Sequence, residues 1–207
     1  GADLAGVLAS LQEGRVDDFR AMIGQFQATS QRIKYAQIPV VAAVRGMALG
    51  GGCEFQMHTA RTVFALESYI GLVEAGVGLL PAGGGLKEIA VRVGMNEPNG
   101  DVFAGLKPYF EAIAMGKVSG SALEAKELKL ARDSDLVVFN AHELLHVAKA
   151  QARAMAESSY RAPLPPNAVP VAGSIGIATF KMMLVNMLAG GFISEHDRCQ
   201  REGTNRV

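Results

Sequence analysis

A run of three glycines at residues 50–52 most constrains how this chain can fold. The β-branched run at residues 40–44 precedes it and predicts a buried strand, while residues 53–60 predict a short helix. Because glycine has no Cβ, we expect a tight turn in which bare backbone approaches whatever lies beside it. The first N–H groups and the positive dipole end of the following helix face the same place. This arrangement favours a developing negative oxygen, as in an oxyanion hole.

Two glutamates accompany this turn. Glu54 comes early in the predicted helix, and Glu74 follows on a second segment bracketed by Gly71, Gly76 and Gly78. Two carboxylates beside an oxyanion site can hold a water molecule, one acting as general base and the other as general acid. Each also has a plainer interpretation, Glu54 as a first-turn helix acid and Glu74 as a solvated loop acid. The residues alone leave both interpretations open.

Composition excludes several classes of protein. The 207 residues are 49% hydrophobic and 19% charged, as expected of a globular domain with a large core. Zero net charge and the absence of tryptophan give no indication of a nucleic-acid partner. The two cysteines, Cys53 and Cys199, lack metal-ligand spacing, so we expect no metal site and a reducing, cytoplasmic compartment, with Cys53 as a core residue. Neither glycine run has the spacing of a phosphate-binding loop.

The remaining pattern predicts mostly helices. We expect one or two amphipathic helices in residues 6–36, strands at 62–65 and 136–139, and helices at 86–93, 106–115, 119–128 and 141–158. The four prolines in residues 161–170 predict a linker to a C-terminal helix at 175–188. Lys181 and a glycine pair interrupt that apolar stretch, so we expect a buried helix and no membrane span. We therefore divide the chain into residues 1–160 and 161–207, and expect poor order in the polar tail 198–207.

The central block matches a known family. The stretch IPVVAAVRGMALGGGCE (residues 38–54) resembles the signature of the crotonase, or enoyl-CoA hydratase/isomerase, superfamily. The similarity continues through GLVE (71–74), GLLP (78–81), the glycines at 83–85, and AMGKVSGSA (114–122), and GADL (1–4) resembles the first oxyanion-loop motif. It covers roughly residues 1–158. It implies an α/β fold, a crotonase-like spiral of ββα units followed by a C-terminal helical region.

The resemblance also implies roles for four residues. Ala2 and Gly51 match the two backbone N–H donors that hold the thioester oxygen, and Glu54 and Glu74 match the first and second catalytic glutamates. Hydratases of the family use both glutamates, whereas its isomerases typically keep only the second. The implied reaction is hydration of a trans-2-enoyl-CoA to a 3-hydroxyacyl-CoA in fatty-acid β-oxidation. No metal or redox cofactor is implied, because CoA arrives with the substrate. An enoyl-CoA isomerase and a non-catalytic acyl-CoA-binding module are the alternatives.

Three positions depart from the family pattern, and the chain begins abruptly. His58 replaces part of a frequent Cys-Asp pair, Val73 a frequent proline, and Lys129 a frequent glycine; we expect His58 to be buried and hydrogen-bonded. Family members have several strands before the GAD motif, so we expect N-terminal strands to be missing. Residues 65–74 and 177–183 resemble the hydratase-like segment of large bacterial 3-hydroxyacyl-CoA dehydrogenases. A homo-oligomer, or other domains of such a chain, are the expected partners.

Overall fold

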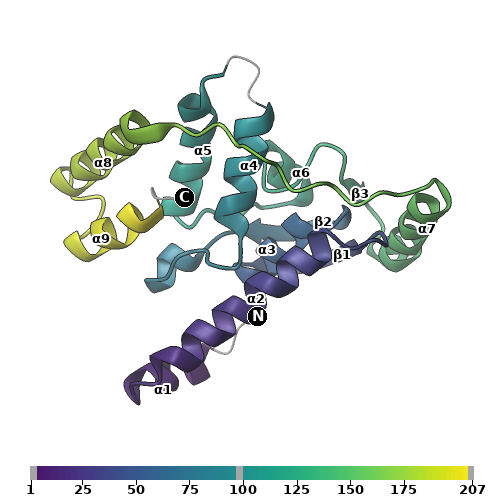
Figure 1. The fold of residues 1–207 in the computed structure, drawn as a ribbon, viewed down its shortest axis with the longest axis horizontal. Coiled ribbons are helices and arrows are strands. Elements are labelled where there is room, and N and C mark those ends of the chain that lie inside the picture. The colour runs from purple at the N-terminus through teal and green to yellow at the C-terminus, as the bar shows by residue number, and fades with distance from the viewer. Residues whose placement is uncertain (1–3, 97–99, 205–207) are drawn as a thin grey trace.

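A small parallel sheet lies at the centre of the computed structural model, which describes residues 4–96 and 100–204 (Figure 1). Its described strands are β1 (Val41–Leu49), β2 (Arg61–Gly71) and β3 (Leu136–Val138), in the order β1-β2-β3. Parallel neighbours need a crossover connection, and α3 (Gly51–His58) supplies it between β1 and β2. The three expected strands are therefore present. β1 and β2 are longer than the strands predicted at residues 40–44 and 62–65.

An irregularity in the β1–β2 pairing sets where these strands end. Val44 pairs with Phe64, but Gly46 pairs with Ser68, so β2 carries extra residues at this point. The buried hydroxyl of Ser68 donates to the carbonyls of Val44 and Ala65 and so satisfies polar groups that the bulge exposes. After the bulge the register resumes and Leu49 pairs with the last residue of β2. Both strands therefore deliver the chain to the same edge of the sheet.

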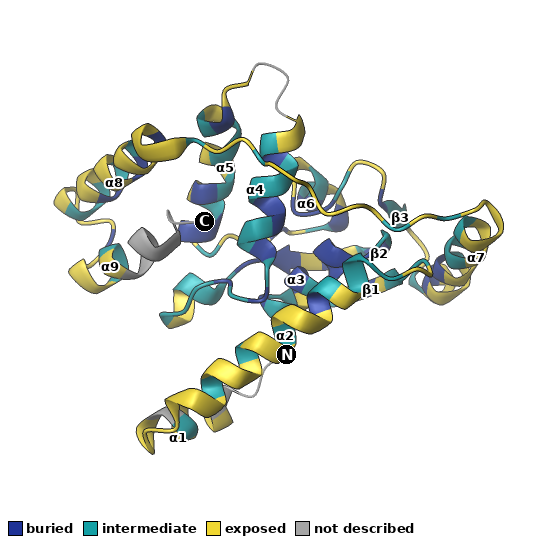
Figure 2. Ribbon diagram, viewed as in Figure 1, coloured by how far each residue is buried: buried dark blue, intermediate teal, exposed yellow. Residues whose placement is uncertain are grey.

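Helices cover both faces of this sheet. The others are α1 (Leu4–Gln12), α2 (Val16–Lys34), α4 (Gly85–Asn96), α5 (Val102–Ala114), α6 (Ala122–Glu127), α7 (Leu144–Glu157), α8 (Gly173–Ala189) and α9 (Glu195–Thr204), with short 3-10 turns η1 (Glu74–Val77) and η2 (Ala141–Glu143). Phe64 belongs to the main core with residues of α3, α4 and α5, whereas Val63 and Ala65 pack with α7. Alternate residues of β2 thus face opposite layers. Most of β2 is buried between them (Figure 2).

The C-terminal region crosses back over α4. The stretch between α7 and α8 lacks regular structure and passes α4 in Figure 1. It packs closely there, since an ideal Cβ built on Gly94 would lie 2.4 Å from the Pro170 carbonyl oxygen. Phe180 of α8 then stacks against Phe103 and Phe110 of α5. Whether residues 161–207 form a separate unit stays a prediction. None of the helices in the described part of the chain is long and apolar enough to cross a bilayer.

The polar tail is the element that the sequence pattern misjudged. Residues 198–207 were expected to lack order, but residues 198–204 continue α9, which begins at Glu195; residues 205–207 lie outside the described part of the chain. The Ser194 hydroxyl accepts from the Asp197 N–H, and the Asp197 carboxylate accepts from the Ser194 N–H. This reciprocal capping starts a helix without an apolar face. The expectation was wrong because it considered apolar periodicity alone.

Lys129 occupies a backbone conformation that favours glycine. Its φ is 56°, directly after the C-cap Leu128 of α6. The N–H of Leu130 donates to the Ala125 carbonyl and the N–H of Lys129 to the Lys126 carbonyl, which together form a Schellman motif. A side chain in the left-handed region costs roughly 1–2 kcal/mol. The family preference for glycine here therefore has a local conformational cause.

We predict that Lys129→Gly raises the free energy of unfolding by about 1 kcal/mol, because it removes this backbone strain. Urea unfolding followed by circular dichroism measures the change. Lys129→Ala is the control, since it keeps the strained φ and removes only an exposed contact with Asp133 of little energetic value. Equal stability of the glycine and alanine variants would contradict the prediction.

Candidate active site

The glycine run joins the edge of the sheet to α3. Gly50 is the N-cap, with φ 53° and ψ −122°, a region that non-glycine residues rarely enter. Its N–H donates to the carbonyl of Gly71 at 2.8 Å. The expected turn spanned all three glycines. In the structure Gly51 and Gly52 already belong to α3, so only Gly50 lies between the strand and the helix. As a first-turn N–H, that of Gly51 has no acceptor within the helix, which suits the predicted donor role. Ala2 lies outside the described residues.

Glu54 is buried against a second glycine run. The N–H of Gly85, the first residue of α4, donates to Glu54 Oε1 at 2.9 Å. Burial raises the pKa of Glu54, and hydrogen bonds from the backbone N–H groups of Gly85, Gly83 and Gly84 oppose that rise. These donors stabilise the carboxylate form relative to an equally buried acid without them. Glu54 does lie in the first turn of α3, as the plainer interpretation expects, but it is buried and accepts a hydrogen bond from a second element.

Glu74 approaches the Gly50 turn from a second segment of the chain. It is the first residue of η1, and an ideal Cβ built on Gly50 would lie 3.0 Å from Glu74 Oε1. Its Oε2 is buried and has no hydrogen-bond partner within the described residues. Burial raises the pKa of Glu74 to about 7. Hydrogen bonds from the backbone N–H groups of Glu74 and Val73 oppose this rise, and repulsion from Glu54 adds to it. The fold thus brings Glu54 and Glu74 within electrostatic reach of each other, in unlike environments.

Sequence reasoning missed two parts of this site. The glycines at 83–85 were read only as a turn, yet they hold Glu54. The ring of Phe26, on α2, packs against Phe55, with ring centroids 4.3 Å apart, and lies between the two glycine runs. An ideal Cβ would approach this ring to 3.1 Å at Gly51 and to 2.0 Å at Gly83. The second glycine run precedes a helix just as the first does, and that repetition was the signal available for it.

A cluster of ionisable side chains packs next to Glu54 and consists of His58, Glu88, Lys34 and Lys87. The His58 ring is fully buried, and its Nδ1 lies 2.7 Å from the Glu54 carbonyl oxygen, a distance at which Nδ1–H donates. Burial lowers the pKa of His58, and its Nε2 lies 3.5 Å from Glu88 Oε1. Burial opposes ionisation of Glu88, but hydrogen bonds from Lys34 and Lys87 hold its pKa below the usual range. The expected buried, hydrogen-bonded histidine is confirmed, and the cluster ties α2, α3 and α4 together.

Cys53 takes no part in this chemistry. It is fully buried, and burial raises the pKa of its thiol to about 12. A thiol that stays protonated is a poor nucleophile, so the core interpretation holds. The described residues contain no group of three or more histidine, cysteine or acidic side chains arranged to hold a metal ion. The chemistry available at the site is that of two carboxylates beside a helix N-terminus.

Sequence comparisons relate the chain to known proteins. Residues 1–159 match the family described as enoyl-CoA hydratase/isomerase. A relative from Bacillus subtilis (strain 168), named "Probable 3-hydroxyacyl-CoA dehydrogenase", is 41% identical over 197 residues, which make up 95% of this chain and 25% of the relative. The mitochondrial methylglutaconyl-CoA hydratase of Homo sapiens is 32% identical over 142 residues, 64% of this chain and 41% of that protein.

Solved structures share the fold. The enoyl-CoA hydratase from Bacillus anthracis has a TM-score of 0.56 at 24% identity, over 91% of this chain and 60% of that one. An enoyl-CoA hydratase from Polaromonas sp. JS666 has a TM-score of 0.59 at 21% identity, over 99% and 66% of the two chains. They confirm the expected crotonase-like α/β fold. The chain belongs to the enoyl-CoA hydratase/isomerase family. It spans a quarter of the length of its Bacillus subtilis relative.

We predict that Gly83→Ala destabilises the protein by about 1–3 kcal/mol, a typical cost of overpacking. The added Cβ would lie 2.4 Å from Glu54 Oε2 and closer still to Phe26, so buried groups must shift. Urea unfolding measures the loss. Gly24→Ala on α2 is the matched control, because an added Cβ there meets nothing within 4 Å and alanine favours the helix. A Gly83→Ala variant as stable as the wild type would contradict this account of the site.

Proposed function

We propose that this chain carries the hydratase site of an enzyme that adds water to a trans-2-enoyl-CoA and yields a 3-hydroxyacyl-CoA. One observation carries the proposal: the carboxylates of Glu54 and Glu74 are close enough for Glu54 to raise the pKa of Glu74, and their environments differ in hydrogen bonding. Paired carboxylates in unlike environments are suited to opposite roles in acid–base catalysis. Structural relatives from Thermobifida fusca YX are described in complex with CoA and with acetoacetyl-CoA, which supports a CoA thioester as the ligand.

The reaction assigns one role to each carboxylate. The Glu54 carboxylate, which accepts a hydrogen bond from the Gly85 N–H, takes a proton from the water molecule. At the same time the water oxygen bonds to the β-carbon of the substrate. Glu74, with a pKa of about 7, supplies a proton to the α-carbon. Negative charge that develops on the thioester oxygen meets the N–H of Gly51, with Ala2 proposed as the second donor. A hydroxyl group from water and a proton from Glu74 are thereby added across the double bond. The step leaves Glu54 protonated and Glu74 ionised, and proton exchange with solvent restores both carboxyl groups for the next cycle.

Several features of the whole enzyme belong to the same proposal. We propose that this segment needs no metal or redox cofactor, because two carboxylates and backbone donors supply every proton transfer and charge in the reaction. The relative named as a 3-hydroxyacyl-CoA dehydrogenase supports a longer parent chain that acts in fatty-acid β-oxidation and also oxidises the hydration product with NAD. Two unpaired cysteines support a cytoplasmic location. We also propose that this segment associates with other domains of the parent chain or with further copies of itself.

We predict that Glu54→Gln and Glu74→Gln each lower kcat for crotonyl-CoA hydration in the full-length protein by roughly a hundred- to ten-thousand-fold. Loss of the conjugated-thioester absorbance measures the rate. Glu67→Gln is the control, since Glu67 is exposed on β2, the strand that leads toward Glu74. Unchanged rates in both site variants would refute the proposal. A Glu54→Gln variant that still isomerises 3-enoyl-CoA would favour the isomerase alternative, and binding without turnover the non-catalytic module.

We also predict that kcat/KM falls as the pH rises through about 7, because Glu74 must carry a proton to act as the acid. The pH dependence of kcat/KM for crotonyl-CoA measures this fall.

The raised pKa of Glu74 also makes the free energy of unfolding depend on pH. Ionising Glu74 favours the unfolded chain, so the free energy of unfolding falls as the pH rises from 4.5 toward 7. This fall should be smaller in Glu74→Gln, measured by urea unfolding at several pH values. An identical pH dependence in both proteins would argue against the raised pKa.

A further inference from the structure

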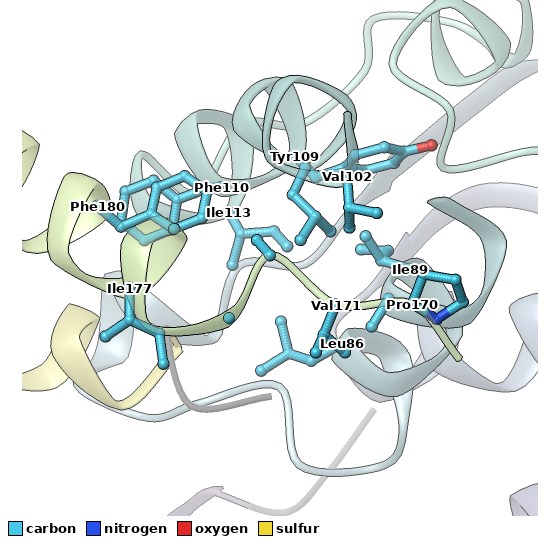
Figure 3. Close-up of a pocket in the computed structure, with 15 residues that line it drawn as sticks. Leu86, Ile89, Val102, Tyr109, Phe110, Ile113, Pro170, Val171, Ile177 and Phe180 are labelled. Atoms are coloured by element: carbon cyan, nitrogen blue, oxygen red, sulfur yellow. The ribbon is translucent and has the colours of Figure 1, made fainter. Parts of the chain in front are cut away.

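The position of α4 relative to α3 decides whether Glu54 keeps its hydrogen bond. The donor is the N–H of Gly85, the first residue of α4, and a hydrogen bond weakens steeply as the donor tilts away from the acceptor. The apolar side of α4, with Leu86 and Ala90, lines a cavity of about 380 Å³ (Figure 3). Glu88 stands midway between these two residues in the sequence and so lies on the opposite side of the helix, toward α3. The polar side of α4 is therefore the side that meets the site.

The His58 ring lies between the backbone of Glu54 and the second glycine run. His58 follows Glu54 by one turn of α3, and its Nδ1–H donates to the Glu54 carbonyl at 2.7 Å, which fixes the direction of the ring. The far edge of the ring meets Gly84, where an ideal Cβ would lie 2.9 Å from His58 Nε2 and 3.0 Å from its Cε1. Gly84 is the middle residue of the run 83–85, whose N–H groups bind the Glu54 carboxylate. The ring is thus a spacer between the helix that carries Glu54 and the backbone that binds it.

Charged side chains from two other helices hold this ring in place. Glu88 of α4 contacts it, with Oε1 3.5 Å from His58 Nε2. Lys34 of α2 donates to both Glu88 oxygens, at 2.7 and 2.8 Å, and Lys87 binds Oε1 as well. The ring is therefore enclosed by α3, by α4 and by a carboxylate that α2 anchors. It cannot tilt away from Gly84 without disturbing these buried ionic contacts.

We propose that His58 is a positioning residue for the hydration step: its ring sets the distance between the glycine run 83–85 and Glu54, and so keeps the Glu54 carboxylate ionised and ready to accept a proton from water. The inference rests on the proposed function and adds a residue that does not touch the reacting atoms. Burial raises the pKa of Glu54, and the N–H donors of the run oppose that rise. If the donors retreat, this opposition is lost and the carboxyl group keeps its proton to a higher pH.

The test removes the ring and follows the pH dependence of the full-length enzyme. His58→Ala, or His58→Asn with a side chain too short to reach Gly84, should move the low-pH limb of kcat/KM for crotonyl-CoA upward by about one pH unit, as expected for a weakened hydrogen bond to a charged group. At a pH on this limb the rate should fall about tenfold, in kcat with little change in KM, since His58 does not contact the substrate. His58→Gln, whose amide reaches as far as Nε2, should stay near the wild-type profile.

Gln56→Ala is the matched control. Gln56 is likewise a buried polar residue of α3, but it donates to the Leu130 carbonyl, in the segment that follows α6. This variant should lose stability in urea without moving the low-pH limb. An unmoved limb in both His58→Ala and His58→Asn, with stability lost as in Gln56→Ala, would make His58 a purely structural residue and overturn the inference. A limb that moves downward would also overturn it, because His58 itself would then be the group that titrates there.

An infrared titration separates this inference from the proposed function. The carboxyl band that is absent from Glu54→Gln reports the ionisation of Glu54 without turnover. A higher pKa of Glu54 in His58→Ala than in the wild type supports the positioning role even if crotonyl-CoA is not hydrated. Hydration of crotonyl-CoA by the wild type, together with an equal pKa of Glu54 in both proteins, would refute the positioning role and leave the hydratase proposal standing.

Discussion

The hydrogen bond from the Gly85 N–H to Glu54 Oε1 is the interaction on which the rest of the site depends. It joins the first turn of α4 to the first turn of α3, and each of these helices follows a glycine run. A side chain at Gly83 or Gly85 would press on Glu54, so the carboxylate can be buried only because this backbone is bare. Burying a carboxylate without such donors would cost several kcal/mol.

Unlike surroundings give the two glutamates their different chemistry. Backbone N–H groups stabilise the ionised form of Glu54, while Glu74 has an unpaired buried oxygen and a pKa of about 7. Behind Glu54, the His58 ring and the ionised Glu88 fill the space between α3 and α4. Because Lys34 binds Glu88 from α2, a distant helix is anchored to the same support. The site is therefore held by buried polar contacts on several elements.

Local signals predicted much of the fold. The apolar patterns at residues 40–44 and 62–65 located β1 and β2, and those at 119–128 and 141–158 located α6 and α7. Strand ends were underestimated because β2 continues through a bulge at Ser68 that no local pattern announces. Helix α9 was missed because a capping pair, rather than an apolar face, starts it. At Lys129 the sequence departs from a frequent glycine, and the positive φ of this residue explains why glycine suits the position.

The sequence by itself determined the family, the two glutamates and the glycines beside them, because these are properties of short contiguous motifs. Only the tertiary structure decided that Gly83 and Phe26 lie beside Glu54 and that Glu88 faces the His58 ring, since these residues lie on elements far apart in the chain. It alone also revealed the cavity beside Leu86, because a void is a relation among helices that no single segment encodes. The unlike ionisation of Glu54 and Glu74 has the same origin: burial and neighbouring charge are set by packing.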